Sequence, residues 1–225
     1  METQQIIELL TNYLTQERIA ILNKVLDERT EYISVVLEDI FQTHNASAVL
    51  RSCDCFGIQN VNFIENRYSY MENKDVAMGS SQWLTIKRFN QKENNTLDTI
   101  KAVRDSGYRI VATTPHTNDV AISDLDLTKG KIALFFGSEK PGLSDIVMQN
   151  ADEFVRIPMY GFTESFNISV SAALCLYELT TKLRKSDIDW HLSPSKRTEL
   201  LAQWMKLSAR NAEGLIREYE KRENK

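Results

Sequence analysis

The sequence contains few of the residues that build disulfide frameworks or metal sites. It has three cysteines and three scattered histidines in 225 residues. Cys53 and Cys55 are separated by a single residue, which is too close for a zinc knuckle, and Cys175 stands alone. These spacings predict buried free thiols in a reducing cytoplasm, and no bound metal ion is expected.

Long apolar runs are also missing. No stretch approaches the roughly 20 apolar residues that span a bilayer. The first residues, METQQIIELLTNYLTQER, lack the basic and apolar regions of a signal peptide. With 42% hydrophobic and 26% charged residues, the composition is that of a globular protein with a sizeable core. We therefore expect a soluble cytoplasmic protein that does not associate with membranes.

Basic residues are not in excess, because the net charge is −4 and the pI is near 5.5. The first 45 residues are mainly acidic, whereas the segment from Thr180 onward is mainly basic. Nucleic-acid-binding domains are usually basic, so the total charge argues mildly against such a ligand. The basic tail is compatible with RNA, although a solvated helical surface explains it equally well.

Hydrophobic periodicity predicts helices that alternate with strands. Helices are expected over residues 4–27, 46–56, 97–108, 143–150, a segment ending near 184, and 195–222. Strands are expected over residues 32–40, 61–65, 83–89, 109–115, 131–137 and 153–159. This alternation predicts an α/β fold, in which a parallel sheet is covered by helices on both faces. The expected domains are an N-terminal helical extension (1–30), an α/β domain (31–185) and a C-terminal helical tail (186–225).

Glycine, proline and polar side chains gather where the predicted strands end. The segments concerned are Thr43-His44-Asn45, Thr113-Thr114-Pro115-His116, GSEKPG (137–142) and GFTESFN (161–167). Open α/β sheets bind ligands beyond the carboxyl ends of their strands, so a site is predicted there. No GxGxxG follows the first strand and no GxxxxGK[ST] occurs, which excludes the usual dinucleotide and P-loop motifs.

Three features in these segments or in the helix after the first of them each have two interpretations. Asn45 is either the N-cap of the helix that follows or a site residue. Arg51, on an otherwise apolar helix face, is either a salt-bridged structural residue or a functional cation. The GSEKPG loop either cradles a phosphate at a helix N-terminus or forms a plain tight turn.

Three motifs taken together resemble a known family. HNASAVLRSCDCFGI (44–58), ALFFGSEKPGLS (133–144) and RIPMYGFTESFNISVSAALCLYE (156–178) are similar, in order and spacing, to the motifs of the SPOUT superfamily of RNA methyltransferases, in its TrmH branch. The resemblance covers about residues 20–190. Phe166 departs from the pattern, because the branch usually has leucine at that position, and we expect this change to reshape the cofactor pocket slightly.

The resemblance implies an S-adenosyl-L-methionine-dependent RNA 2′-O-methyltransferase with a C-terminal trefoil knot. It also implies a homodimer in which the sites form near the subunit interface. It assigns the proton transfer to Arg51, as a base or as a stabilising cation. It assigns the positioning of substrate or motif loops to Asn45, Glu139, Ser165 and Asn167. It assigns cofactor contacts, largely through backbone groups, to Thr113, Gly137, Ile157 and Phe166.

The same resemblance points to tRNA as the partner and substrate. About 30 mainly helical residues precede the first strand, too few for the separate RNA-binding domain of the rRNA-directed members. The helical N-terminus, the MGSSQWL segment (78–84) and the basic tail are similar to members that methylate guanosine 18 of the tRNA D-loop. The alternatives are 2′-O-methylation of rRNA or of the tRNA wobble nucleotide, a non-catalytic RNA-binding protein of the same fold, and a generic α/β ligand-binding domain.

Overall fold

The computed structural model describes residues 1–115 and 119–223, which divide into two compact units. The α/β unit spans Thr30–Trp190, and the helical unit combines Met1–Arg29 with the chain from His191 onward. Ile188 and Trp190 pack against the core of the α/β unit, so the chain leaves that unit after Trp190. The two ends of the chain therefore belong to one helical unit, which the sequence pattern did not indicate.

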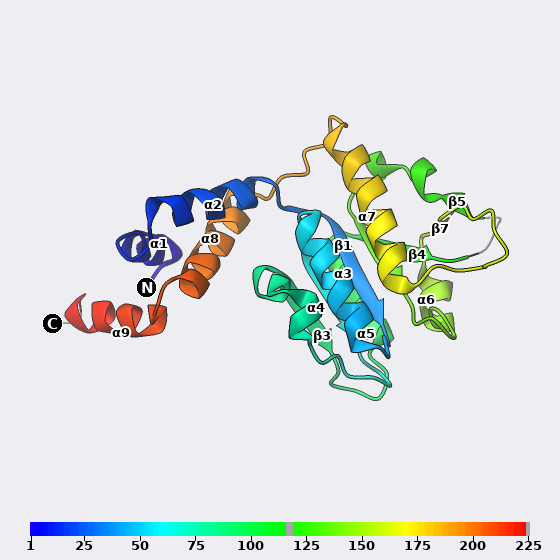
Figure 1. Cartoon of the computed structure of the whole chain (residues 1–225), viewed down its shortest axis with the longest axis horizontal. Coiled ribbons are helices and arrows are strands. Elements are labelled where there is room, and N and C mark those ends of the chain that lie inside the picture. Colours follow the sequence, from blue (N-terminus) through cyan, green and yellow to red (C-terminus); the bar gives the residue numbers. More distant parts are fainter. Residues whose placement is uncertain (116–118, 224–225) are drawn as a thin grey trace. The chain divides into compact units, whose positions relative to one another are not determined.

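A seven-stranded sheet forms the centre of the α/β unit (Figure 1). Its strands are β1 (Thr30–Glu38), β2 (Ile58–Ile64), β3 (Thr85–Phe89), β4 (Arg109–Thr113), β5 (Val120–Ala121), β6 (Ile132–Phe136) and β7 (Glu153–Arg156). Their order is β3-β2-β1-β6-β4-β7-β5, and each neighbouring pair is parallel. The predicted parallel sheet is confirmed, whereas the edge strand β5 was missed because two residues carry no periodicity.

The strand order places β1 and β6 side by side at the middle of the sheet. From β1 the chain moves outward through β2 and β3, while β4, β7 and β5 lie on the other side of β6. The order of the strands thus reverses between β1 and β6. A crevice beyond the carboxyl ends of two such strands is where α/β sheets bind ligands.

Helices cover both faces of the sheet, as predicted. On one face α3 (Thr43–Cys55) and α7 (Ile168–Arg184) lie side by side (Figure 1). Their buried side chains belong to the larger core and include Val49, Cys53, Ala172 and Leu176. The other face carries α5 (Thr96–Asp105) and α6 (Asp145–Asn150). The small Ala172 is fully buried, and it allows α7 to pack closely against its neighbours.

Several predicted boundaries were wrong. Asn45 is not the N-cap of α3, because the helix begins at Thr43 and Gln42 occupies the cap position. The strand predicted over 153–159 ends at Arg156, so Ile157 and Met159 lie in the loop that follows. The short helix α4 (Lys74–Ala77) and 3₁₀ turns at Ser80–Trp83, Ile122–Asp124 and Leu127–Lys129 were not predicted.

Each terminal helix of the prediction is in fact a pair of helices. Residues 4–27 form α1 (Thr3–Thr11) and α2 (Gln16–Asp27), because Thr15 caps α2 by accepting a hydrogen bond from the Arg18 backbone at 3.2 Å. The tail forms α8 (Pro194–Ser208) and α9 (Ala212–Glu223), with Asn211 in the left-handed region at φ 58°. Neither break contains glycine or proline, so the periodicity alone did not reveal them.

Charges within the helical unit pair with one another. Arg197 forms an ion pair with Asp27 at 2.8 Å, and the N-terminal amino group pairs with Glu220 at 3.1 Å. The guanidinium of Arg29 lies 5.1 Å from the ring centre of Trp204, and both side chains are buried. Asp27 of the N-terminal segment therefore neutralises one basic side chain of the tail, Arg197.

The remaining expectations concern thiols, membranes and chain threading. Cys53, Cys55 and Cys175 are free, but Cys55 is exposed rather than buried because it lies on the outer side of α3. Within the described ranges, no helix has the length and apolar character needed to cross a bilayer. The trefoil knot stays a prediction, because strand order does not define how one loop threads another.

Candidate active site

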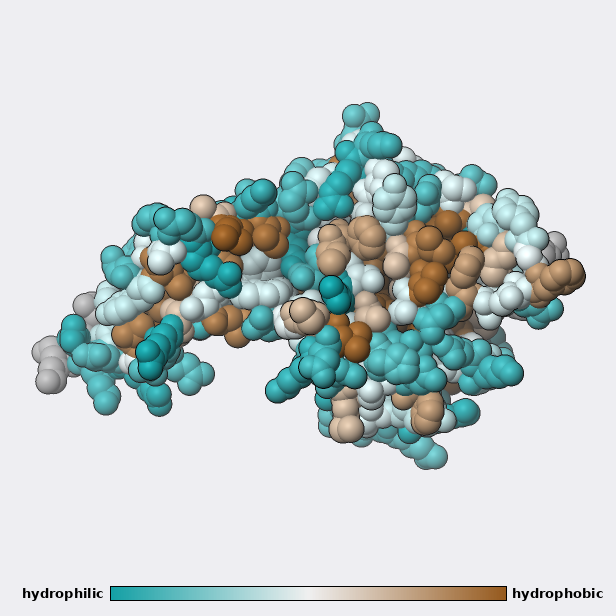
Figure 2. Space-filling model, in the orientation of Figure 1, coloured by the Kyte–Doolittle hydropathy of each residue, from teal (hydrophilic) through white to brown (hydrophobic). Residues whose placement is uncertain are grey.

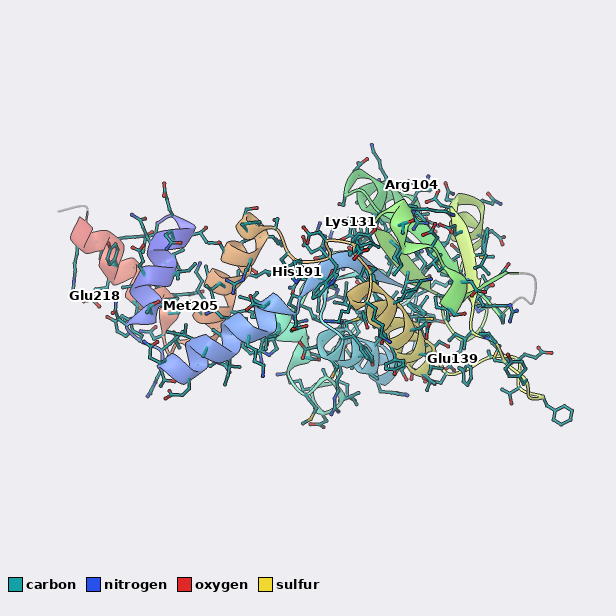
Figure 3. The ribbon with its side chains drawn as sticks, turned by 90° about the horizontal axis from the view of Figure 1, so that it is seen from above. Arg104, Lys131, Glu139, His191, Met205 and Glu218 are labelled. Atoms are coloured by element: carbon teal, nitrogen blue, oxygen red, sulfur yellow. The ribbon has the colours of Figure 1, made fainter. Side chains whose placement is uncertain are left out.

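Three polar side chains from distant parts of the sequence meet beside the ends of β1 and β6. The amide of Asn45 donates to Oε1 of Glu139 at 3.2 Å. The amide of Asn167 donates to the same oxygen at 2.9 Å and to Oδ1 of Asn45 at 3.1 Å. Figure 3 shows Glu139 beside the beginning of α7. We call this group the Asn–Glu–Asn cluster (Asn45, Glu139, Asn167).

The local structure fixes each member of the cluster. Asn167 is the N-cap of α7, where its Oδ1 accepts hydrogen bonds from the backbone and hydroxyl of Ser169 at 2.9 and 2.6 Å. The cap therefore directs the amide group of Asn167 toward Glu139. Asn45 lies in the first turn of α3 with 4% of its surface exposed, and it also donates to Oε1 of Gln42 at 2.8 Å. Within the described residues, Oε2 of Glu139 accepts no hydrogen bond.

A first cavity of about 560 Å³ adjoins the cluster. Its walls come from the loops after β1, β2 and β6 and from the segment before α7. The lining residues are Ile40, Phe41, Gln42, Asn45, Tyr68, Ser138, Glu139, Lys140, Ser165, Phe166, Asn167 and Ile168. The predicted positioning residue Ser165 thus shares one cavity with the Asn–Glu–Asn cluster.

A second cavity of about 520 Å³ lies beyond the ends of β4, β6 and β7. The four predicted cofactor positions, Thr113, Gly137, Ile157 and Phe166, all line it. Apolar side chains form much of its wall, and the carboxylates of Glu139, Asp145 and Glu164 lie around it. Ser138, Glu139, Ser165, Phe166 and Ile168 line both cavities, so the two adjoin. Both volumes fall within the range of roughly 300–1,000 Å³ that is usual for ligand sites.

The loop between β6 and α6 folds tightly back on itself at Gly137. A Cβ atom at this position would lie 2.2 Å from the backbone of Gly142 and of Leu143. Only glycine fits such a close approach of two backbone segments. The GSEKPG pattern therefore marks a tight turn, and this turn brings Glu139 to the cluster.

Cys175 of α7 lies in the wall of the second cavity. Burial raises the pKa of its thiol to about 12. The thiol is protonated near neutral pH and is a poor nucleophile there. It acts as an apolar part of the wall.

The structure does not bring Arg51 together with the other predicted residues. Its side chain is exposed on α3 and lines neither cavity. It lies six residues after Asn45, which is about 9 Å along the helix axis. His116, which also follows a predicted strand, lies outside the described residues.

Phe41, Gln42, Tyr68 and Lys140 line the first cavity but were not predicted as site residues. Phe41 and Gln42 directly follow the predicted strand 32–40, and Tyr68 follows β2. Their place after strand ends was the available signal, but their side chains match no motif. The described part of the chain contains no group of three histidine, cysteine or acidic side chains arranged to hold a metal ion.

The model of the SpoU rRNA Methylase family matches residues 32–177. The chain belongs to this family. The match covers most of the α/β unit and includes the whole Asn–Glu–Asn cluster. The residues of the candidate site thus lie within the segment that this chain shares with a family of RNA methyltransferases.

Individual relatives of this SpoU-family chain are similar over most of their length. A tRNA (guanosine(18)-2′-O)-methyltransferase of Borreliella burgdorferi is 40% identical over 205 residues, covering 91% of this chain and 92% of the relative. The enzyme of that name from Escherichia coli K12 is 30% identical over 162 residues, covering 72% and 68%. The crystal structure of a TrmH/SpoU tRNA modifying enzyme of A. aeolicus superposes with a TM-score of 0.76 at 26% identity, covering 86% of this chain and 97% of that one.

Proposed function

We propose that this chain transfers a methyl group from S-adenosyl-L-methionine to the ribose 2′-hydroxyl of guanosine 18 in tRNA. The observation that carries this proposal is the Asn–Glu–Asn cluster, set between two adjoining cavities at the centre of the sheet. The transfer needs a methyl donor and a nucleotide held side by side. The target nucleotide and its position in this proposal are taken from the names of the relatives from Borreliella burgdorferi and Escherichia coli, which are tRNA (guanosine(18)-2′-O)-methyltransferases. A tRNA substrate also agrees with the cytoplasmic location expected from the sequence.

The second cavity suits the methyl donor. S-Adenosyl-L-methionine supplies an activated methyl group on a positively charged sulfur. Thr113, Gly137, Ile157 and Phe166 would hold it, with the apolar wall around its adenine. The carboxylates of Glu139, Asp145 and Glu164 complement a cationic ligand in this cavity. Phe166 provides a larger side chain than the leucine usual in the TrmH branch.

The first cavity suits the nucleotide. Glu139 and Ser165 line both cavities, so their polar groups lie where a ribose held in the first cavity would face the second. Asn45 and Asn167 hold one oxygen of Glu139 and leave the other to accept a hydrogen bond from the substrate. The cluster therefore orients the carboxylate and the substrate together.

Arg51 acts in this proposal as a fixed cation. A guanidinium remains protonated in proteins and is a poor base, but it binds phosphate well and stabilises developing negative charge. Because Arg51 lines neither cavity of its own subunit, we propose that a second copy of the chain brings it to a nucleotide.

An exposed apolar stripe on α7 and the residue before its cap supports a homodimer. Phe166, Val170, Leu174 and Tyr177 recur at helical spacing, and each has 40–58% of its surface exposed. Figure 2 shows hydrophobic residues gathered over α7. Apolar patches of this kind are typical of protein interfaces. The stripe begins at Phe166, which lines both cavities, so a partner on it would adjoin the site.

The decisive experiment uses an unmodified tRNA transcript, labelled S-adenosyl-L-methionine, and mapping of 2′-O-methyl positions. The expected result is methylation at guanosine 18 alone. A matched transcript with 2′-deoxyguanosine at position 18 is the control, and it should accept no label. Transfer only to rRNA fragments or to the wobble nucleotide would favour the alternative substrates. Binding of S-adenosyl-L-methionine without transfer to any of these RNAs would favour a non-catalytic RNA-binding protein.

A further inference from the structure

Two aromatic rings lie next to each other in the wall of the first cavity. Phe41 follows β1 and Tyr68 follows β2. Their ring centres are 4.9 Å apart with an angle of 67° between the planes. Phe41 has 67% of its surface exposed and Tyr68 has 41%. We call them the aromatic pair.

The loops that carry the aromatic pair are fastened together behind it. The carboxylate of Asp39 accepts hydrogen bonds from the backbone amides of Asn66 and Arg67 at 2.7 and 2.8 Å. The backbone amide of Asp39 donates to the carbonyl of Ile64 at 2.9 Å. These bonds connect the end of β1 to the end of β2 and the segment after it, shortly before each ring in the sequence. The aromatic pair is thus held in place although it is exposed.

An exposed pair of aromatic rings in a fixed position is unfavourable in water unless a ligand covers it. The pair shares its cavity with a basic side chain, Lys140, and with the Asn–Glu–Asn cluster. Stacking surface, a cation and polar groups in one cavity are the combination that binds single nucleotides of RNA, whose unstacked bases lie on aromatic rings.

We propose that Phe41 and Tyr68 are the platform on which the base of the target nucleotide stacks while its ribose faces Glu139. This inference rests on the proposed methyl transfer to tRNA and adds the residues that position the base. The base leaves the tRNA fold to enter the cavity, as in other enzymes that act on a nucleotide within a folded nucleic acid. The rings are positioning residues, and neither takes part in the transfer itself.

A double-mutant cycle between enzyme and RNA tests this platform. The enzyme variants are Phe41→Leu and Tyr68→Leu, which keep apolar bulk, with the matched controls Phe41→Tyr and Tyr68→Phe, which keep a ring. The RNA is either unmodified tRNA or tRNA with an abasic ribonucleotide at position 18. Affinity for each RNA is measured by filter binding, and affinity for S-adenosyl-L-methionine by calorimetry.

Each leucine variant should bind unmodified tRNA roughly 5- to 150-fold more weakly, the range that loss of one base–aromatic stack produces. It should bind the abasic tRNA as well as the wild type does, and its affinity for S-adenosyl-L-methionine should not change. The ring-keeping controls should resemble the wild type with both RNAs.

Two results would overturn the platform. One is an equal loss of affinity for both RNAs, since the rings would then contact another part of the tRNA or only support the loop. The other is loss of the dimer with unchanged RNA binding, measured by light scattering, since a second copy would then cover the pair. If the wild-type enzyme does not methylate guanosine 18 at all, the proposed function fails, and that result is separate from either of these.

Discussion

The side-chain amide of Asn167 donates a hydrogen bond to Oδ1 of Asn45 at 3.1 Å, across 122 positions of sequence. This contact joins the N-terminus of α7 to the first turn of α3. Both residues also donate to one oxygen of Glu139. The α7 helix cap and the proposed substrate site therefore share a single side chain, Asn167.

Two substitutions separate these roles of Asn167. Asn167→Ala removes the cap and the cluster contacts, so it should lower the free energy of unfolding by about 1 kcal/mol and also lower the rate of methyl transfer. Asn167→Asp keeps the cap acceptor but replaces the amide donor with a second carboxylate beside Glu139, so it should lose activity although the cap is retained. Urea unfolding and single-turnover methyl transfer measure the two effects. Wild-type activity in Asn167→Asp would contradict the role of the cluster.

Arg51→Ala should lower the rate of methyl transfer about 100-fold or more, the range expected when a group that stabilises developing negative charge is removed. The side chain is exposed, so the variant should keep the wild-type Tm. Arg51→Lys retains the charge without the planar fork and should recover only part of the rate. Full turnover in the alanine variant would remove Arg51 from the mechanism.

Gly137→Ala should disrupt the turn after β6. Its Cβ would lie 2.2 Å from the backbone of Gly142, so we expect a loss of about 1–3 kcal/mol in stability and much weaker binding of S-adenosyl-L-methionine. Gly161→Ala is the matched control, because its nearest neighbour would be 4.0 Å away and the change should be tolerated. Calorimetric titration with S-adenosyl-L-methionine compares the two. Equal affinities would show that the turn is dispensable.

The apolar stripe of α7 predicts the oligomeric state. Leu174→Glu and Tyr177→Glu should convert a dimer into a monomer of 25.9 kDa in light scattering, because a buried carboxylate is unfavourable in an apolar interface. Leu97→Glu, an exposed position on α5 at the opposite face of the sheet, serves as the control and should leave the dimer intact. A dimer that persists in both α7 variants would place the interface elsewhere.

Cys175 should remain unmethylated when the protein is incubated with S-adenosyl-L-methionine at neutral pH, and intact mass spectrometry detects any added methyl group.

The raised pKa of the Cys175 thiol also predicts a pH effect on stability. In the unfolded chain a thiol ionises near pH 8.5, whereas the native thiol ionises only near 12. Its contribution is therefore complete below about pH 8.5 and is lost as the pH rises toward 12. Cys175→Ala should show a shallower alkaline decline in urea midpoints than the wild type, and parallel curves would contradict this assignment.

The amino-acid sequence determined the kind of fold and most of the residues proposed for the site. β6 is an uninterrupted apolar run, which predicts a strand buried on both faces, and all five of its residues are buried. Gly57 and Gly107 end helices in the left-handed region as their positions indicate. The resemblance to the family named four proposed cofactor positions, which the structure places around one cavity, and the three residues of the cluster, which it brings into contact.

Tertiary structure decided how these parts meet. Asn45 fits a helix cap by sequence, yet it lies in the first turn of α3, where it donates to Glu139 of the loop after β6 and accepts from Asn167, the N-cap of α7. Phe41 and Tyr68 form a pair only because β1 and β2 end side by side. The two ends of the chain pack into one helical unit, and Asp27 pairs with Arg197 there. Local pattern specifies strands and turns, whereas contacts between distant segments depend on strand order, and periodicity carries no information about that order.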